Sequence, residues 1–356
     1  MAIIAMGSPY YPPSIGGIEI HTKNLVTKLR RKGHEVVVVS SIGSDLVPRC
    51  LKIPYSPIPI SFPKVKAEIY HSHVPSPFFA RRFAELSEKE RKPHVVTYHN
   101  DVILPSRVNG YPIPRFIARL VEKLNDHLVI GALEKAEVII ATTKSYAETS
   151  PVLSKFMNKI KIVPNAVDPS EFCPGVDAGK REPLVLYVGR LVAYKGVSTL
   201  IKAMAEVQKE MDAKLVVVGD GEDRKAFERL AEKLSVKAVF TGRVPRKEVV
   251  EWMQKARVLV LPSYSRLEAF GIALLEAMAC STPVIGANTP GVSEVALQGG
   301  FTFNSLQELV EKIKEVLQDD LLATKLGKNG RKAVEEKFNW DFVVERIEKI
   351  YFEVLG

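Results

Sequence analysis

The stretch from Leu184 to Leu200 reads LVLYVGRLVAYKGVSTL and joins a strand, a turn and the start of a helix. Its first five residues are apolar and include two valines and a tyrosine, a composition that favours a buried strand. Gly189 and Gly196 mark the two ends of a turn, and an amphipathic helix is expected from Val197. A buried strand followed by a helix is the repeating unit of parallel sheets covered by helices. The stretch therefore predicts an α/β fold.

The same unit recurs on both sides of this stretch. In the first half, strands are expected at Ala2–Met6, Glu35–Ser40, Glu68–His71, Val95–Tyr98 and Val138–Thr142, and helices near Ile18–Arg31, Pro77–Lys92, Ile113–Lys135 and Thr143–Glu148. In the second half, strands are expected at Leu184–Val188, Leu215–Val218, Ala238–Thr241, Val258–Leu261 and Val284–Gly286, and helices near Val197–Met211 and Glu222–Leu234 and from Arg246 and Gly271. From Gly299-Gly300 the chain is expected to pass directly into a helix. The pattern predicts two parallel sheets, and no internal sequence repeat relates them.

The length and one proline-rich segment point to two domains. A chain of 356 residues corresponds to two domains at roughly 100–200 residues each. Residues 164–183 contain four prolines, two glycines and several acidic residues, as exposed interdomain linkers do. We place the first domain at residues 1–172 and the second at residues 173–338. Ligands of such sheets bind at the carboxyl ends of the strands, which predicts a binding cleft between the two domains.

The composition is that of an ordinary folded protein. Hydrophobic residues make up 46% and charged residues 26% of the chain, which excludes the disordered, collagen-like and low-complexity classes. Apolar runs such as Val258–Leu261 reach only strand length, far short of the roughly 20 residues of a membrane span. The apolar Ala2–Met6 shows no leader pattern, and Cys50, Cys173 and Cys280 are scattered. These features predict a protein of the reducing cytoplasm.

Positive charge is concentrated in the first half. Residues 1–172 contain 23 Lys and Arg against 15 Asp and Glu, whereas residues 173–356 contain 27 against 26. Basic clusters such as Arg30-Arg31-Lys32 fit a solvated helix surface best, and nucleic acid, an anionic membrane or a phosphorylated ligand are the alternatives. No basic run alternates with aromatic residues, which disfavours binding to nucleic acid.

A glycine-rich turn follows the first expected strand of the chain and ends in Gly16-Gly17, just before a helix. The backbone can approach a ligand closely there, and the free N–H groups of the helix can receive an anion. A plain flexible turn has the same pattern, so the two interpretations stay open.

The turn from Gly189 to Gly196 adds two cations, Arg190 and Lys195, to the N-terminus of a helix. A guanidinium supplies planar bidentate donors and an ammonium supplies a mobile point charge. Together they suit a diphosphate and would neutralise the charge that builds up on a departing one. Surface cations without a function are the alternative.

A third turn, Gly219-Asp220-Gly221-Glu222, resembles part of a dinucleotide fingerprint. Arg224 occupies the place of the third glycine, and the motif does not follow the first strand of its domain, which disfavours a nicotinamide or flavin site. These glycines fit a tight turn between a strand and a helix.

The strongest signal is the pair Glu268 and Glu276, which flanks Phe270, Gly271 and an apolar stretch. Eight residues of continuous helix would rise about 12 Å. That separation fits poorly with the carboxyl pair of a glycosidase, which lies about 5–9.5 Å apart. It does fit two acceptors that hold separate polyol groups of one long ligand, such as a sugar and a ribose.

With these motifs the chain resembles the retaining glycosyltransferases of family 4, in group 1, over nearly its whole length. Their pattern of two glutamates separated by seven residues matches Glu268 and Glu276, their Gly-Arg-Leu element begins at Gly189, and their Lys-Gly element matches Lys195-Gly196. The resemblance implies the GT-B fold, with two Rossmann-like parallel-sheet domains that face a central cleft. It also implies that residues 339–356 form a helix that crosses back to the first domain.

The resemblance also implies a role for individual residues. Glu268 is expected near the donor sugar, Glu276 at the ribose hydroxyls, Arg190 and Lys195 at the diphosphate, and His99 at the reacting sugar. Catalytic roles are expected for His99, Glu268, Arg190 and Lys195, and substrate contacts for Gly16, Gly17, Gly189, Gly221, Phe270, Gly271, Ile272 and Glu276. No cofactor or metal is expected. His71 and His73 could form a metal pair, but no third ligand stands at a telling spacing, which favours a structural or acceptor-side role.

These expectations combine into a metal-independent, retaining hexosyltransferase that uses a UDP- or GDP-sugar. Its acceptor would be a sugar, a lipid phosphate or another anionic molecule, and the basic first domain would make peripheral contact with an anionic membrane at its cytoplasmic face. The alternatives are a sugar-nucleotide epimerase of the same fold, which needs no acceptor, and a non-catalytic nucleotide-sugar binding protein, which shows no turnover. A nucleic-acid-binding protein would leave Glu268 and Glu276 unexplained.

Overall fold

The computed structural model describes all residues except 15, 52–55, 105–106 and 109–110. The chain forms two compact units. Unit 1 comprises Met1–Asn165 and Trp340–Gly356, and unit 2 comprises Ala166–Asn339. The chain first passes from unit 1 to unit 2 between Asn165 and Ala166. This boundary lies earlier than the one between residues 172 and 173 that the linker pattern predicted. The reason is that the linker packs on unit 2, because the side chain of Phe172 is fully buried in a core of that unit.

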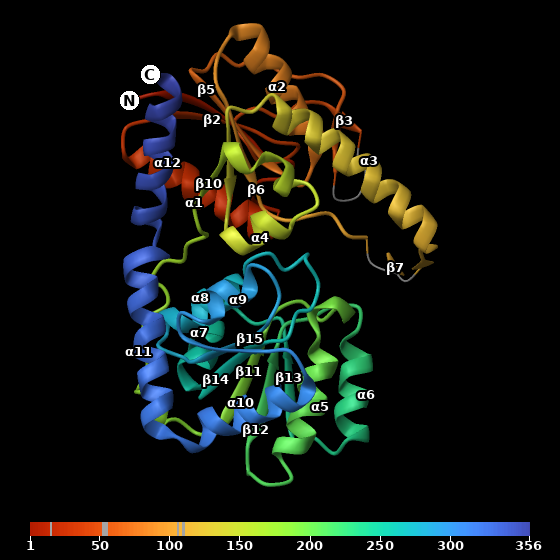
Figure 1. The fold of residues 1–356 in the computed structure, drawn as a ribbon, viewed down its shortest axis with the longest axis vertical. Helices are drawn as coiled ribbons and strands as arrows, with labels where there is room; N and C mark the ends of the chain where they lie inside the picture. Colours follow the sequence, from red (N-terminus) through yellow and green to blue (C-terminus); the bar gives the residue numbers. More distant parts are fainter. Residues whose placement is uncertain (15, 52–55, 105–106, 109–110) are drawn as a thin grey trace. The chain divides into compact units, whose positions relative to one another are not determined.

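Unit 1 is built on a parallel sheet with the strand order β10-β9-β6-β5-β1-β2. Its strands are β1 (Ile3–Gly7), β2 (Glu35–Val39), β5 (Ile69–Val74), β6 (His94–Tyr98), β9 (Val138–Ala141) and β10 (Ile160–Ile162). Its helices are α1 (Gly17–Arg31), α2 (Pro77–Glu90), α3 (Arg115–Glu134), α4 (Lys144–Thr149) and α12 (Trp340–Leu355). Two short hairpins pair β3 (Cys50–Leu51) with β4 (Ile58–Pro59) and β7 (Arg107–Val108) with β8 (Tyr111–Pro112). Figure 1 shows α1 and α12 on one side of the sheet and α2 and α3 on the other.

Unit 2 is built on a second parallel sheet, with the strand order β13-β12-β11-β14-β15-β16. Its strands are β11 (Leu184–Val188), β12 (Lys214–Val218), β13 (Ala238–Gly242), β14 (Val258–Leu261), β15 (Val284–Ala287) and β16 (Gly300–Phe303). Its helices are α5 (Val197–Val207), α6 (Arg224–Lys233), α7 (Arg246–Lys255), α8 (Ile272–Ala279), α9 (Val292–Ala296), α10 (Leu306–Gln318) and α11 (Asp320–Lys337). This is the strand order of dinucleotide-binding folds, in which the chain leaves β11 and β14 in opposite directions.

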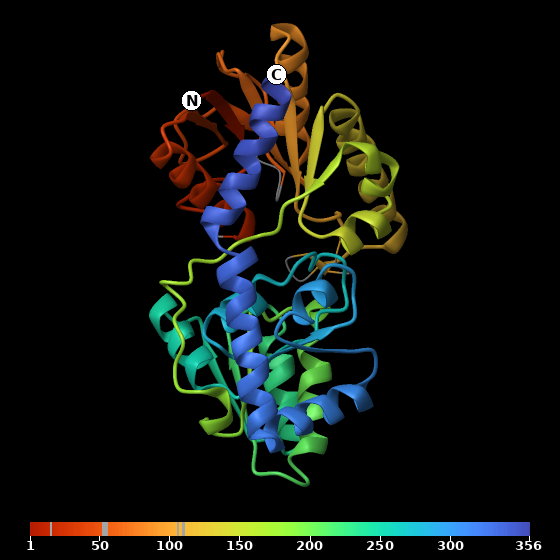
Figure 2. The ribbon, with the colours of Figure 1, turned by 60° about the vertical axis from the view of Figure 1, so that its left-hand side comes forward.

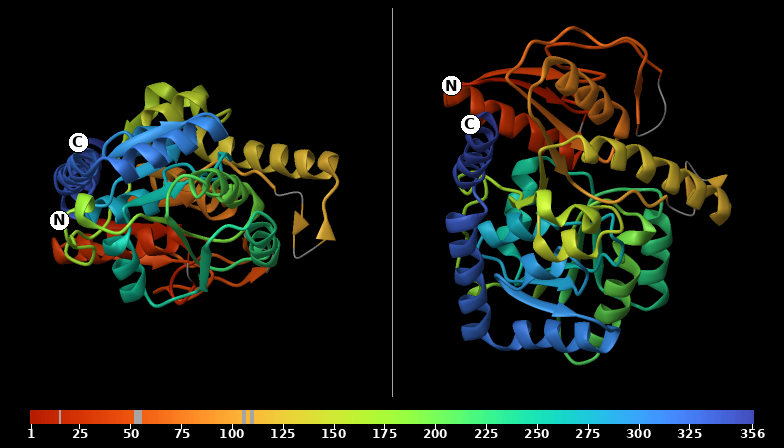
Figure 3. Two further views of the ribbon diagram at one scale, coloured as in Figure 1. Left: turned by 90° about the horizontal axis from the view of Figure 1, so that it is seen from below. Right: turned by 45° about the horizontal axis from the view of Figure 1, so that its top comes forward.

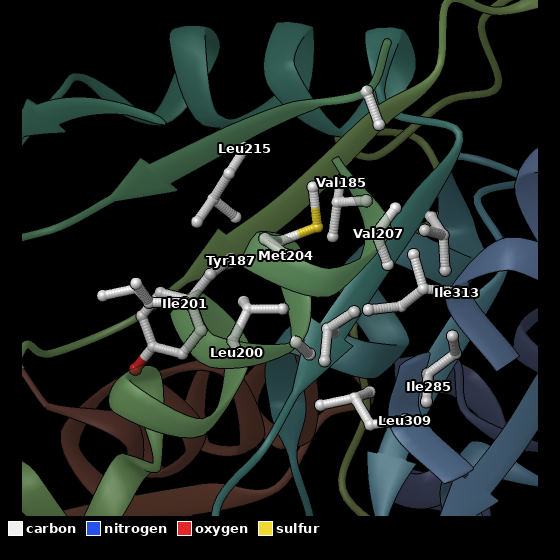
Figure 4. Close-up of a cluster of buried hydrophobic side chains, with 14 of the residues drawn as sticks. Val185, Tyr187, Leu200, Ile201, Met204, Val207, Leu215, Ile285, Leu309 and Ile313 are labelled. Atoms are coloured by element: carbon white, nitrogen blue, oxygen red, sulfur yellow. The ribbon is translucent and has the colours of Figure 1, made fainter. Parts of the chain in front are cut away.

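The sheet of unit 2 has a hydrophobic core on each face. Successive side chains of a strand point to opposite faces, so Val185 and Tyr187 of β11 join one core while Leu184 and Leu186 join the other. Figure 4 shows the first core, in which side chains of α5 pack on the sheet and Leu309 and Ile313 of α10 close it. Both faces of the strands are therefore buried, which explains their continuous apolar runs.

Two strands of the six-stranded sheets were missing from the sequence prediction, and both lie at sheet edges. The short hairpin strands β3, β4, β7 and β8 were missing as well. The prediction that Gly299-Gly300 leads directly into a helix is wrong, because β16 intervenes and pairs with β15. A Cβ atom on Gly300 would collide with the carbonyl of Val284, so this position requires glycine. The other strand, β10, has only partly buried or exposed residues and pairs with β9 alone.

The C-terminal helix α12 packs against α1 and completes unit 1 (Figure 2). Lys28 of α1 forms an ion pair with Asp341, at 2.8 Å. The Tyr351 hydroxyl is buried and lies 2.5 Å from Nδ1 of His71 on β5. In the part of the chain that the structure describes, no helix is long and apolar enough to span a membrane.

A buried arginine ties together the chain segments at the base of unit 2. Arg181 donates hydrogen bonds to six groups from three segments: the carbonyls of Val176, Met253, Ala256, Cys280 and Ser281 and the hydroxyl of Thr282, at 2.6–3.4 Å. Burial lowers the pKa of its guanidinium to about 10. The guanidinium remains charged at neutral pH and satisfies carbonyls that would otherwise be buried without a partner.

We expect Arg181→Met to destabilise unit 2 by about 3–5 kcal/mol, because the buried carbonyls would lose their donor. Urea unfolding of the full chain with Trp340→Phe in every variant, followed by the fluorescence of Trp252 in α7, measures this loss. Arg229→Met on the exposed side of α6 is the control and should change the midpoint little. An unchanged midpoint in Arg181→Met would contradict the role given to this side chain.

Candidate active site

The topology of unit 2 brings two predicted site segments together. β11 and β14 are adjacent, and the strand order reverses between them. Ligands of such sheets bind at this switch point, outside the carboxyl ends of the strands. The segment Gly189–Gly196 follows β11, and the segment 262–271 follows β14. Residues far apart in the sequence thus meet at one edge of the sheet.

The ammonium of Lys195 and the carboxylate of Glu268 form an ion pair at this edge. Both side chains are mostly buried, with exposed fractions of 18% and 13%. Burial alone would lower the pKa of Lys195, but the charge and hydrogen bond of Glu268 outweigh it and raise the pKa. A fixed positive charge therefore lies beside a fixed acceptor, as a diphosphate and a sugar hydroxyl would require.

Arg190 lies in the same turn, with its side chain exposed. Its carbonyl accepts a hydrogen bond from the buried Tyr187 hydroxyl, at 2.9 Å, which holds the backbone of the turn. The preceding Gly189 has a φ of 156°, at the edge of the range that favours glycine. In the part of the chain that the structure describes, the ion pairs of Glu268 and Glu276 are made with Lys195 and Arg246, and the exposed Arg190 is in neither pair.

The turn at Gly219 and Gly221 supports the Arg190 turn by close backbone packing. A Cβ atom on Gly219 would collide with the carbonyl of Gly189, and one on Gly221 with the carbonyl of Leu191. The Leu191 amide donates to the Asp220 carbonyl at 3.0 Å, which joins the two turns. These glycines allow the tight turn that the sequence predicted. Gly221 packs directly against the backbone of Leu191, in the turn that carries Arg190 and Lys195.

Glu276 lies in α8 and pairs with an arginine that sequence reasoning missed. Its Oε1 accepts a hydrogen bond from Nη1 of Arg246, at 2.7 Å, and Arg246 also pairs with Glu171. Burial raises the pKa of the Glu276 carboxyl, while the Arg246 guanidinium works against this rise. Among the described residues, Oε2 of Glu276 has no hydrogen-bond partner. One oxygen is thus fixed and the other can accept from a ligand hydroxyl.

The start of α8 sets the geometry of the glutamate pair. Gly271 is the N-cap of α8 with a φ of 81°, a left-handed conformation that favours glycine. Phe270 is buried in the core below, and Ile272 begins the helix. Glu268 therefore lies in the preceding loop and Glu276 in the helix, so the two carboxylates are held by different elements.

The predicted residues of unit 1 follow two strands of its own sheet, β1 and β6. Gly16 is the N-cap of α1 and Gly17 its first residue, while Ile15 lies outside the described residues. His99 directly follows β6 and is buried, with an exposed fraction of 9%. Its amide donates to the carbonyl of Val74 at the end of β5.

His99 belongs to a cluster of buried histidines. Its Nε2 lies 2.9 Å from Nδ1 of His73, whose Nε2 faces Met6 Sδ at 3.0 Å. The ring of His21 packs edge-on against both rings, with centroid distances of 5.1 and 5.8 Å. Burial lowers the pKa of His21 to about 4 and holds those of His73 and His99 well below 6.5. The cluster is therefore neutral at pH 7.

Ring nitrogens of His21, His73 and His99 lie within 4.8 Å of one another. The fold brings these three histidines together from separate segments, which their spacing in the sequence did not indicate. His73 and His99 are joined by a direct hydrogen bond of 2.9 Å. Two nitrogens on one zinc ion would lie about 3.4 Å apart. The observed spacing is that of a hydrogen-bonded pair, which holds the orientation of the His99 ring.

Comparison with known families matches both units. Residues 174–333 match the model of the glycosyl transferases group 1, and residues 15–171 match that of glycosyltransferase family 4. The chain belongs to the group 1, family 4 glycosyltransferases. An uncharacterized glycosyltransferase of Methanocaldococcus jannaschii is 29% identical to it over 401 aligned positions, which cover 99% of each chain.

Solved structures show the fold of this glycosyltransferase. Sucrose-phosphate synthase from Thermosynechococcus elongatus superposes with a TM-score of 0.76 at 22% identity, over 99% of each chain. Anabaena HepE in complex with UDP-glucose superposes with a TM-score of 0.73 at 16% identity, over 99% of this chain and 100% of HepE. Both are GT-B enzymes, so the predicted α/β class and GT-B fold are confirmed.

Proposed function

We propose that this glycosyltransferase transfers a hexosyl unit from a nucleotide-diphosphate sugar to an acceptor hydroxyl with retention of configuration and without a metal. The observation that carries the proposal is the Lys195–Glu268 pair at the switch point of unit 2. Arg190 lies in the same turn as Lys195, and Glu276 follows Glu268 in α8. Cations for a diphosphate and acceptors for hydroxyls are thus found on one edge of the sheet.

The nucleotide and the sugar would engage different glutamates. Oε2 of Glu276 would accept a hydrogen bond from a ribose hydroxyl, and Glu268 would accept one from the donor sugar. The UDP-glucose in the HepE structure supports a UDP- or GDP-sugar as donor here. His99, held as a neutral imidazole by burial, would orient the reacting sugar.

Departure of the diphosphate is the costly step of this reaction. The bond between the anomeric carbon and the β-phosphate oxygen breaks, and its electron pair stays on that oxygen. Lys195 and Arg190 would stabilise the negative charge that develops there. The acceptor oxygen then bonds to the anomeric carbon on the same face, and its proton moves to the departed phosphate oxygen. No side chain is assigned as a nucleophile.

The acceptor would be a sugar, a lipid phosphate or another anionic molecule, bound by unit 1. The excess of Lys and Arg over Asp and Glu in residues 1–172 supports this choice. Peripheral contact of unit 1 with an anionic membrane belongs to the same proposal, because a lipid acceptor would be reached there.

Calorimetric titration with UDP-, GDP- and ADP-sugars in EDTA tests the donor site. We expect one of them to bind at micromolar Kd and Glu276→Ala to weaken that binding at least about tenfold, because the hydrogen bond from a ribose hydroxyl to a carboxylate oxygen is lost. Glu171→Ala is the matched control, since Glu171 contacts the same Arg246 but is far more exposed than Glu276.

The outcomes of this titration separate the possibilities. Equal loss in Glu171→Ala and Glu276→Ala would assign the effect to Arg246 and not to the ribose. Absence of binding for all donors, with and without Mg²⁺, would contradict the proposed donor site. Binding that appears only with Mg²⁺ would contradict metal independence.

A further inference from the structure

Helix α3 exposes an apolar face that no described part of the chain covers. On the opposite side, Ala118, Val129, Ala132 and Leu133 are buried against unit 1. The exposed fractions of the apolar face are 73% for Phe116, 42% for Ile117, 68% for Leu120, 43% for Val121 and 59% for Leu124. These positions follow the spacing of a single helix face. Apolar side chains in such a contiguous patch mark an interaction surface.

A row of cations runs beside this face. Arg115, Arg119 and Lys123 are spaced by one helical turn each, and all three are exposed. The N-terminal half of α3 extends away from the sheet of unit 1 (Figure 3). The helix therefore presents a long apolar ridge with a positive border, the pattern of helices that lie in a membrane interface.

We propose that this face of α3 docks into the surface of an anionic lipid bilayer. The apolar side chains would enter the boundary between headgroups and acyl chains, and the cations would bind lipid phosphates. The proposal identifies α3 as the surface that makes the membrane contact proposed above. The role of that contact, access to a lipid acceptor, rests on the proposed function. Docking itself needs neither donor nor turnover, so it is measured separately from them.

The size and charge of the face favour a bilayer over a second copy of the chain. Five side chains of one helix offer only a few hundred Å², below the roughly 800 Å² that each partner contributes to a stable protein interface. A bilayer supplies both an apolar phase of unlimited extent and a negative surface. The row of cations on α3 is complementary to that surface.

Sedimentation of the full chain with vesicles tests the proposal. We expect binding to phosphatidylcholine vesicles that contain about a third phosphatidylglycerol, little binding to phosphatidylcholine alone, and weakening with salt. The double variant Phe116→Ser, Leu120→Ser should weaken binding at least about tenfold. Arg119→Gln with Lys123→Gln should weaken it for anionic vesicles only.

Matched controls come from unit 2. Lys225→Gln with Arg229→Gln removes two exposed cations spaced by one turn on α6, and Leu321→Ser removes an apolar side chain that is 85% exposed on α11. Both should bind vesicles like the parent chain. Equal binding by the α3 variants, or no preference for anionic lipid, would overturn the proposal. If the chain forms dimers without lipid and Leu120→Ser dissociates them, a second copy of the chain and not a bilayer would be the partner of this face.

Discussion

Glu268→Ala and Arg190→Ala should each lower turnover by about 100-fold or more. Removal of one group that contacts the transition state has an effect of this size once the bound substrates exclude water from around that group. Glu268→Ala also leaves the mostly buried Lys195 without its partner. The measurement is the release of nucleoside diphosphate from the donor that calorimetry selects, first with water and then with candidate acceptors.

Two further variants make this experiment sharper. Glu268→Gln keeps the shape and one acceptor but removes the charge, so it separates hydrogen bonding to the sugar from the ion pair with Lys195. Glu182→Ala removes an exposed glutamate that pairs with Lys214 elsewhere in unit 2 and should leave turnover unchanged. Near-normal rates in both Glu268→Ala and Arg190→Ala would refute the assignment of the site.

Acidification should unfold unit 1 before unit 2. All seven histidines of the chain precede Asn165, so they lie in unit 1. Burial lowers the pKa of His21 to about 4 and those of His71 and His94 to about 3, whereas an unfolded histidine titrates near 6.5. Between about pH 6.5 and these values the unfolded state binds more protons, so stability falls as the pH falls. Each such histidine removes up to about 1.4 kcal/mol per pH unit.

The two tryptophans report the two units separately. Trp340 of α12 lies in unit 1, with its ring 5.3 Å from that of His21, and Trp252 of α7 lies in unit 2. In Trp252→Phe, the remaining fluorescence should change between about pH 5.5 and 4, while in Trp340→Phe it should change only at lower pH. His94→Gln should move the first transition to lower pH. An earlier transition at Trp252 would contradict the prediction.

The sequence allowed the buried strands and the two units to be predicted, but not the order of the strands. Central strands such as β11 are apolar on both faces and are bounded by glycine, so local pattern suffices for them. Edge strands such as β10 bury less and carry no such run. The motifs at Lys195 and Glu268 were visible separately, whereas their contact depends on β11 lying beside β14.

Two features of the candidate site had no local signal. Arg246 stands in the charged first turn of α7, and only the fold brings it to Glu276, 30 residues away. His21 looks like one residue of an amphipathic helix, yet it lies beside His73 and His99. Contacts of this kind join separate elements, so neither spacing nor composition indicates them.

Helix α12 belongs to unit 1 but follows unit 2 in the sequence. Unit 1 is therefore begun before unit 2 during synthesis but is completed after it. A nascent chain has all the described strands of unit 1 once residue 162 has been made, but it lacks Trp340–Leu355 until the whole of unit 2 has been made. The apolar surface that α12 covers, beside His21 and His71, therefore stays open on the ribosome while the contiguous unit 2 closes. We expect the first-made half of the molecule to be the last to mature.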